Sequence, residues 1–197
     1  MRRLANLIVI VLMMLTLAAC GGKNAAPSTD APAQTAAENN APAAPTLSET
    51  YTSEDGKWSF QYPAGWVLTT PVTNILLIAS SEATANKTFT TAAFEPGEAA
   101  LQLGLNTINS GNSDPATHVK TFAGSIGIPL GDAAATTVAG RQAGRVDGQN
   151  DARHLMVVSQ IFGATYVDAV TYTNPGEFAP MEATLLAIIE SIHYTAE

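Results

Sequence analysis

Ser125 is the residue whose surroundings come nearest to those of a catalytic nucleophile. It lies in the run Ala123-Gly124-Ser125-Ile126-Gly127, which approximates a nucleophile elbow. In such an elbow, a sharp turn from a strand into a helix exposes the serine hydroxyl. Here the serine falls near the end of an expected helix. We therefore interpret the run as a helix C-terminus closed by Gly127, and we expect no hydrolase activity from it.

Three histidines, His118, His154 and His193, are the other candidates for catalysis or metal binding. No two of them have the spacing of metal ligands, and none lies in a His-Glu-x-x-His pattern. A shared metal site would require the fold to gather them. We expect exposed or hydrogen-bonded histidines, and neither a metal nor a cofactor.

Asp147, Gln149 and Asp151 alternate like the first, third and fifth ligands of a calcium loop. Ala152 stands where such a loop has its glycine, and no acidic residue closes the loop at its twelfth position. A connection between two strands explains the same residues and is the favoured interpretation.

Arg141, Arg145 and Arg153 are half of the six basic residues of the predicted folded domain and lie within 13 positions. Guanidinium groups bind carboxylates and phosphates through paired hydrogen bonds. The three arginines are therefore a candidate patch for an anion or an acidic protein partner. The alternative is that they pair with nearby acids, such as Asp147 and Asp151.

Hydrophobic periodicity and turn residues indicate the elements that must position these side chains. Expected strands cover 51–54, 57–62, 66–69, 75–79, 88–94, 100–108, 134–138, 142–147, 153–162 and 165–172. One expected helix starts with Asp114 as its cap and Pro115 in its first turn. Another follows Asn174-Pro175-Gly176 and ends near Ile192, with apolar residues three and four apart. This pattern predicts an α+β fold, an antiparallel sheet packed between helices as an α/β/α sandwich.

The N-terminal segment has the features of a secretory signal. Arg2 and Arg3 precede an apolar run over 7–15, which is too short to cross a bilayer comfortably. The run leads into Leu17-Ala18-Ala19-Cys20, which resembles the lipobox of bacterial lipoproteins. The resemblance implies that 1–19 is removed and that Cys20 carries a thioether-linked diacylglycerol and an N-acyl chain. The alternatives are an uncleaved signal anchor, or ordinary cleavage after Ala19.

The composition changes sharply near Leu47. Residues 21–48 contain nine Ala, four Pro and no aromatic residue, whereas all 13 aromatic residues lie in 51–194. A segment of that composition cannot bury enough apolar surface to offset the entropy lost on ordering. We therefore predict a lipidated cysteine and disordered linker over 20–48, and one folded domain over 49–197.

A family resemblance covers roughly residues 50–195. The run Phe60-Gln61-Tyr62-Pro63-Ala64-Gly65-Trp66 resembles the Phe-x-Tyr-Pro-x-Gly-Trp element that opens PsbP-like domains. Val138-Ala139-Gly140-Arg141-Gln142-Ala143 is similar to a hairpin midway in that family, and Ile189-Glu190-Ser191-Ile192 to the end of its last helix. The family is named for an extrinsic photosystem II subunit and shares its fold with a Ran-binding nuclear import factor. The resemblance implies that fold and a non-enzymatic binding or accessory role, with no cofactor site carried over.

Charge and cysteine content exclude several classes of function. The chain has 9 Lys+Arg against 17 Asp+Glu, which argues against a nucleic-acid binder because phosphate contacts need basic residues. A single cysteine excludes an intrachain disulfide framework. We expect a non-catalytic module in the cell envelope, outside the cytoplasm, attached to a membrane through acyl chains on Cys20 and bound to an unknown envelope protein. The alternative is a lipoprotein that captures a small solute in a pocket.

Overall fold

The computed structural model describes residues 46–72, 75–109 and 113–195. Cys20, the expected signal peptide over 1–19 and nearly all of the expected linker lie outside these residues, so all three remain predictions. Within the described ranges, no helix is both long enough and apolar enough to span a bilayer.

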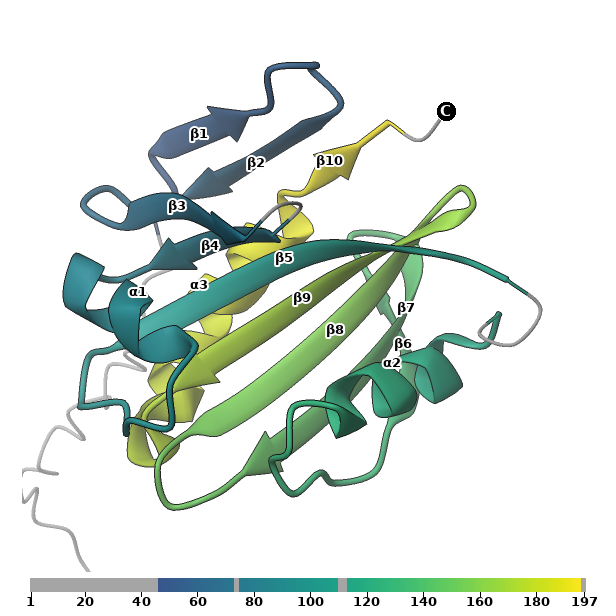
Figure 1. Ribbon diagram of the computed structural model, residues 1–197. Helices are drawn as coiled ribbons and strands as arrows, with labels where there is room; N and C mark the ends of the chain where they lie inside the picture. The colour runs from purple at the N-terminus through teal and green to yellow at the C-terminus, as the bar shows by residue number, and fades with distance from the viewer. Residues whose placement is uncertain (1–45, 73–74, 110–112, 196–197) are drawn as a thin grey trace, which may run out of the picture. The chain divides into compact units, whose positions relative to one another are not determined.

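The centre of the fold is a seven-stranded antiparallel sheet in the order β3-β4-β5-β9-β8-β7-β6 (Figure 1). A second antiparallel sheet has the order β1-β2-β10. The strands are β1 (Glu49–Thr52), β2 (Trp58–Tyr62), β3 (Val67–Val72), β4 (Ile75–Ala79), β5 (Ala99–Thr107), β6 (Ala134–Val138), β7 (Arg141–Gln149), β8 (His154–Phe162), β9 (Thr165–Thr173) and β10 (His193–Tyr194).

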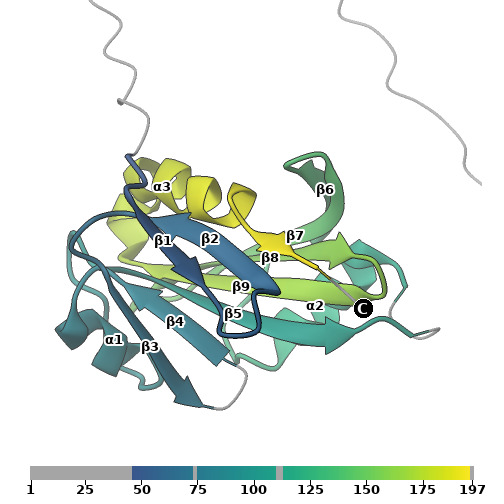
Figure 2. The same cartoon turned by 90° about the horizontal axis from the view of Figure 1, so that it is seen from above.

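Helices cover both faces of the large sheet, as the α/β/α prediction requires. In Figure 1, α1 (Glu82–Thr88) and α2 (Pro115–Gly124) lie in front of the sheet, and α3 (Phe178–Glu190) lies behind it. A one-turn 3-10 helix over Pro175–Glu177 leads into α3. Figure 2 shows the same layers from above, with the β1-β2-β10 sheet beside α3. The α+β fold predicted from the sequence is confirmed.

The two faces of the sheet form separate apolar cores, because successive residues of a strand point to opposite faces. On the α3 face, Leu101 and Val158 pack with Leu185 and Ile188 of α3. On the other face, Val157 and Val170 pack with Val119 of α2. Burial on both faces explains why the central strands carry apolar residues at both odd and even positions.

The helix α2 begins as its sequence predicts and lies very close to β7. The Asp114 carboxylate accepts a hydrogen bond from the backbone N–H of Thr117 at 2.7 Å, and Pro115 is the first helical residue. A Cβ atom added to Gly144 of β7 would lie 2.1 Å from the backbone oxygen of Pro115. Only a glycine at this position lets the start of the helix approach the strand so closely.

The predicted strand over 88–94 is wrong. Residues Glu82–Thr88 form α1, which the sequence analysis did not anticipate, and no regular element follows until β5. Ser81 caps the helix by accepting a hydrogen bond from the backbone N–H of Thr84. The threonines of 88–94 favour strand on propensity, but Thr88 is already the last residue of α1. The backbone carbonyls after α1 hydrogen-bond with Arg153 instead of with a neighbouring strand.

Candidate functional site

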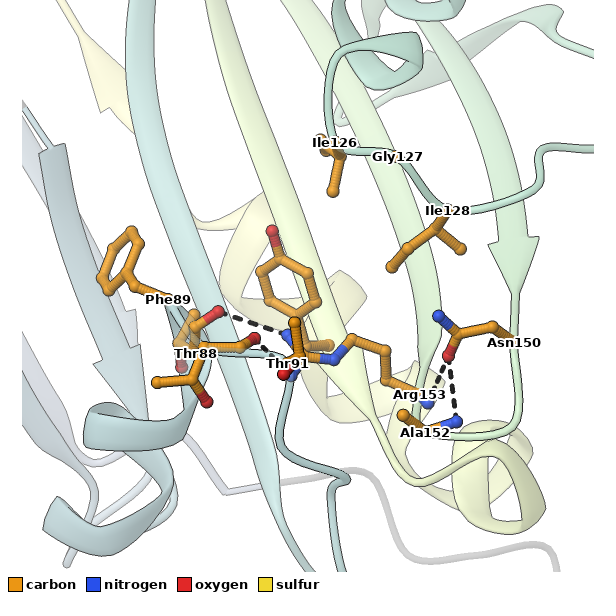
Figure 3. A pocket seen from close by; sticks show the side chains of 11 residues that line it. Thr88, Phe89, Thr91, Ile126, Gly127, Ile128, Asn150, Ala152 and Arg153 are labelled. Carbon is orange, nitrogen blue, oxygen red and sulfur yellow. Dashed lines mark hydrogen bonds between the residues drawn. The ribbon is translucent and has the colours of Figure 1, made fainter.

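Arg153, immediately before β8, is a buried arginine that binds the segment after α1. The residue is 5% exposed. Its Nη1 donates to the carbonyl oxygen of Thr88 at 3.2 Å, and its Nη2 donates to those of Thr90, at 2.9 Å, and Ala92 (Figure 3). A guanidinium has five N–H donors. Three are used here, so two have no acceptor among the described residues.

No carboxylate in the described part of the chain pairs with Arg153. Its guanidinium carbon instead lies 5.0 Å from the ring centroid of Phe94 and 5.4 Å from that of Tyr172, both at cation–π distance. Burial lowers the pKa of Arg153 because the charged form loses hydration. Carbonyl oxygens and aromatic faces therefore compensate this charge only in part.

Arg153 lines a pocket of about 330 Å³, which we call the Arg153 pocket. One wall is the end of α1 and the residues after it, and another is the segment after α2. The turn between β7 and β8, with Arg153 and Tyr172, completes the lining. Figure 3 shows Phe89, Ile126 and Asn150 around this space. Its lining residues are Thr88, Phe89, Thr90, Thr91, Ile126, Gly127, Ile128, Asn150, Ala152, Arg153 and Tyr172.

Tyr172 contributes a second polar group to this pocket. The residue is 6% exposed, and its hydroxyl, which has no hydrogen-bond partner among the described residues, remains accessible from the pocket. Burial raises its pKa, and the nearby charge of Arg153 acts in the opposite direction. The hydroxyl therefore remains protonated near neutral pH and is available as a donor.

The other two candidate arginines lie elsewhere. Arg141 places its guanidinium 4.4 Å from the ring centroid of Phe162, which belongs to the core beneath α3. Arg145 pairs with Asp147 of its own strand and with Glu182 of α3, each at 2.8 Å. The hydrogen bonds that Arg145 donates to Asp147 and Glu182 raise its pKa, against the effect of burial. The structure therefore does not bring the three arginines together into one patch, since Arg153 lies on the opposite face of the sheet.

A polar cluster that the sequence analysis missed lies between α2 and the sheet; we call it the Asp168 cluster. Asp168 of β9 is 1% exposed, and its carboxylate contacts three side chains. His118 Nε2 lies 2.9 Å from Oδ1, Ser159 Oγ donates to the same oxygen, and Asn106 Nδ2 donates to Oδ2. The His118 ring stacks on Tyr166 with their centroids 3.8 Å apart. The detectable signal was an acidic residue within an otherwise apolar strand.

The Asp168 cluster contains serine, histidine and aspartate, but not in the order of a catalytic triad. In a triad, the histidine stands between the other two and takes the proton of the serine. Here the carboxylate stands in the middle, and Ser159 donates to Asp168 instead of to an imidazole. Ser159 and His118 are also buried. The cluster therefore links α2 to β5, β8 and β9, and it lacks the serine–histidine hydrogen bond of a triad.

Ser125 and the three histidines, the remaining candidates from the sequence, form no catalytic or metal-binding arrangement among the described residues. Ser125 is the C-cap of α2 and donates to the carbonyl oxygen of Phe122 at 2.7 Å, which confirms the helix-end interpretation. The three histidines lie on α2, β8 and β10 and are not gathered into a site; the His154 ring stacks on Phe178 at 3.7 Å. Among the described residues, no three His, Cys, Asp or Glu side chains are placed to hold a metal ion.

The acidic segment Asp147, Gln149 and Asp151 is mostly strand rather than loop. The first two residues belong to β7, and Asp151 lies in the turn before β8. Asp147 is bound by Arg145, and Gln149 Oε1 lies 3.3 Å from His154 Nδ1. These oxygens are therefore engaged within the protein, and the predicted connection between two strands is limited to residues 150–153.

No known family model and no curated protein matches this sequence. Solved structures do resemble it. The cyanobacterial PsbP protein CyanoP of Synechocystis sp. PCC 6803 is 16% identical, with 75% of this chain and 92% of that one covered at a TM-score of 0.51. The Ran-binding protein Mog1p of Saccharomyces cerevisiae is 11% identical, and the match covers 76% of this chain and 96% of Mog1p at a TM-score of 0.51. LpqN of Mycobacterium tuberculosis, described as involved in cell envelope biogenesis, is 14% identical, with 75% and 90% covered at 0.51.

Identities this low establish the fold alone. The seven-stranded antiparallel sheet with helices on both faces, together with these likenesses, leads to one conclusion. The chain has the α+β fold of PsbP-like domains, which is also the fold of the Ran-binding protein Mog1p.

Proposed function

We propose that this protein is a lipid-anchored, extracytoplasmic binding or accessory module that performs no catalysis. The observation that carries the proposal is the order in which the side chains of the Asp168 cluster are hydrogen-bonded. Its carboxylate separates Ser159 from His118, and both are buried, so no base activates the serine. The fold likeness to LpqN, a protein involved in cell envelope biogenesis, supports a role in the envelope.

The anchor is proposed from the lipobox-like run that ends in Cys20. Each buried methylene of an acyl chain contributes about 0.8 kcal/mol, so two or three chains anchor a protein stably where one does not. The domain over 49–197 carries 6 Lys+Arg against 15 Asp+Glu. An anionic bilayer repels such a domain, so membrane attachment falls to the acyl chains and not to the domain surface.

Metabolic labelling tests the anchor. We expect radioactive palmitate to be incorporated into the wild-type protein expressed in a bacterial host that processes lipoproteins, and Cys20→Ala to remove the label completely. Ser28→Ala, a substitution in the predicted linker, serves as the matched control and should be labelled like the wild type. Absence of label from the wild type, or equal label on Cys20→Ala, would overturn lipid anchoring.

Crosslinking tests the binding role. In whole cells, amine-reactive and photoactivated crosslinkers should give a discrete heteromeric band with the wild-type protein. Cys20→Ala should reduce the yield of that band, because the module is no longer held at the membrane where its partner lies. Recovery of the monomer alone with several crosslinking chemistries would contradict a protein partner.

A further inference from the structure

We propose that the Arg153 pocket binds a small organic anion, with a carboxylate or phosphate-ester head on a compact apolar body. Two of its polar groups, the Arg153 guanidinium and the Tyr172 hydroxyl, have hydrogen-bonding capacity that no described residue uses. Arg153 is buried without a carboxylate, and two of its five N–H donors have no acceptor in the described part of the chain. The hydroxyl of Tyr172, itself 6% exposed, has no partner there either.

These two groups together select an anion. A buried cation without a counter-charge is unfavourable, and an oxyanion that enters beside it relieves that cost. A phosphate or carboxylate oxygen accepts hydrogen bonds from both a guanidinium and a phenol. A neutral ligand would satisfy the hydroxyl but would leave the charge uncompensated.

The rest of the lining indicates that the ligand is an organic anion. Phe89 is 50% exposed, and the only other exposed large apolar side chain among the described residues is Leu105, at 38%. Phe89 and Ile126 lie at the same pocket as Arg153, as Figure 3 shows. A volume of about 330 Å³ lies at the low end of the range for ligand sites. The pocket therefore fits a ligand whose apolar part is about the size of one aromatic ring.

Titration of the full chain, labelled with ¹⁵N, with phenyl phosphate, benzoate, inorganic phosphate and benzyl alcohol tests the assignment. We expect saturable binding of phenyl phosphate, of benzoate or of both, with chemical-shift changes centred on the backbone N–H groups of Gly127, Asn150 and Thr91. Inorganic phosphate should bind at least tenfold more weakly, because it makes no apolar contact. Benzyl alcohol, which has the ring but no charge, should give no saturable shifts.

Variants separate this site from non-specific binding. Arg153→Met should weaken binding at least tenfold, whereas Arg141→Met, which removes the same charge outside the pocket, should leave it unchanged. If Arg153→Met does not fold, Tyr172→Phe takes its place. It removes a hydroxyl with no protein hydrogen bond and should weaken binding about three- to tenfold.

Three results would overturn the proposal: equal binding of benzyl alcohol, shift changes centred away from the pocket, or wild-type affinity in Tyr172→Phe. Equal affinity for inorganic phosphate would overturn the inference that the ligand carries an apolar body. Because the titration does not depend on acylation of Cys20, its failure leaves the proposed anchor to be judged by palmitate labelling alone.

Discussion

Replacing Asp168 with alanine is expected to lower the free energy of unfolding by about 3–5 kcal/mol. The substitution removes the carboxylate that His118, Ser159 and Asn106 share. Ser159 and His118 are buried, so they cannot recover these hydrogen bonds from bulk water. Because His118 lies on α2 and Asp168 on β9, the loss also detaches the helix from the centre of the sheet. Urea denaturation followed by circular dichroism measures the change.

Asp132→Ala is the matched control for this experiment, because Asp132 is exposed and lies outside the helices and strands. It should change stability by less than about 0.5 kcal/mol. Asp168→Asn keeps the size of the side chain and one acceptor oxygen, so its effect should fall between the two. A loss of less than 1 kcal/mol in Asp168→Ala would mean that the Asp168 cluster does not hold α2 on the sheet.

Gly144→Ala should destabilise the domain by about 3 kcal/mol or more. The added methyl carbon would lie 2.1 Å from the backbone oxygen of Pro115 and 2.9 Å from Cγ1 of Val119. The first contact is with backbone, so no side-chain rotation relieves it. Either α2 moves away from β7, which opens the apolar core on that face, or β7 is displaced. Thermal unfolding, together with the near-ultraviolet circular dichroism of the aromatic residues, reports both outcomes.

Gly104→Ala provides the comparison. Gly104 lies in β5, and a Cβ atom there would have nothing within 4 Å. Alanine should be neutral or stabilise the domain by up to about 1 kcal/mol, since glycine loses more conformational entropy on folding. Equal effects at Gly144 and Gly104 would show that the close approach of α2 to β7 does not constrain the sequence.

The hairpins and helix starts are the parts of the fold that could be predicted from sequence. The pairing of β8 with β9 depends on apolar runs on either side of Gly163, and the turn residues are adjacent in the chain. The start of α2 depends on Asp114 and Pro115, which are also local. The wrong prediction of a strand over 88–94 has a non-local cause. Its backbone carbonyls are satisfied by Arg153, 65 residues further along the chain in the case of Thr88, and no local pattern records that contact.

The candidate site likewise has features that the sequence predicts and features that depend on the fold. The amino-acid sequence is enough to identify the charged residues and the lipobox-like run that predicts an anchor at Cys20. It also identified Arg141, Arg145 and Arg153 as half of the domain's basic residues. The folded structure is needed to see that Arg145 pairs with Asp147 and Glu182, whereas Arg153 is buried with no acid beside it in the described part of the chain.

The physical reason is that a side chain's partners depend on which strands become neighbours and which face of the sheet it occupies. Arg153 and Tyr172 share a face only because β8 pairs with β9, and the segment after α1 reaches them across β5. His118 meets Asp168, 50 residues away, for the same reason. Hydrophobic periodicity fixes which residues are buried, but strand order fixes which buried polar groups meet, and that order arises from long-range packing.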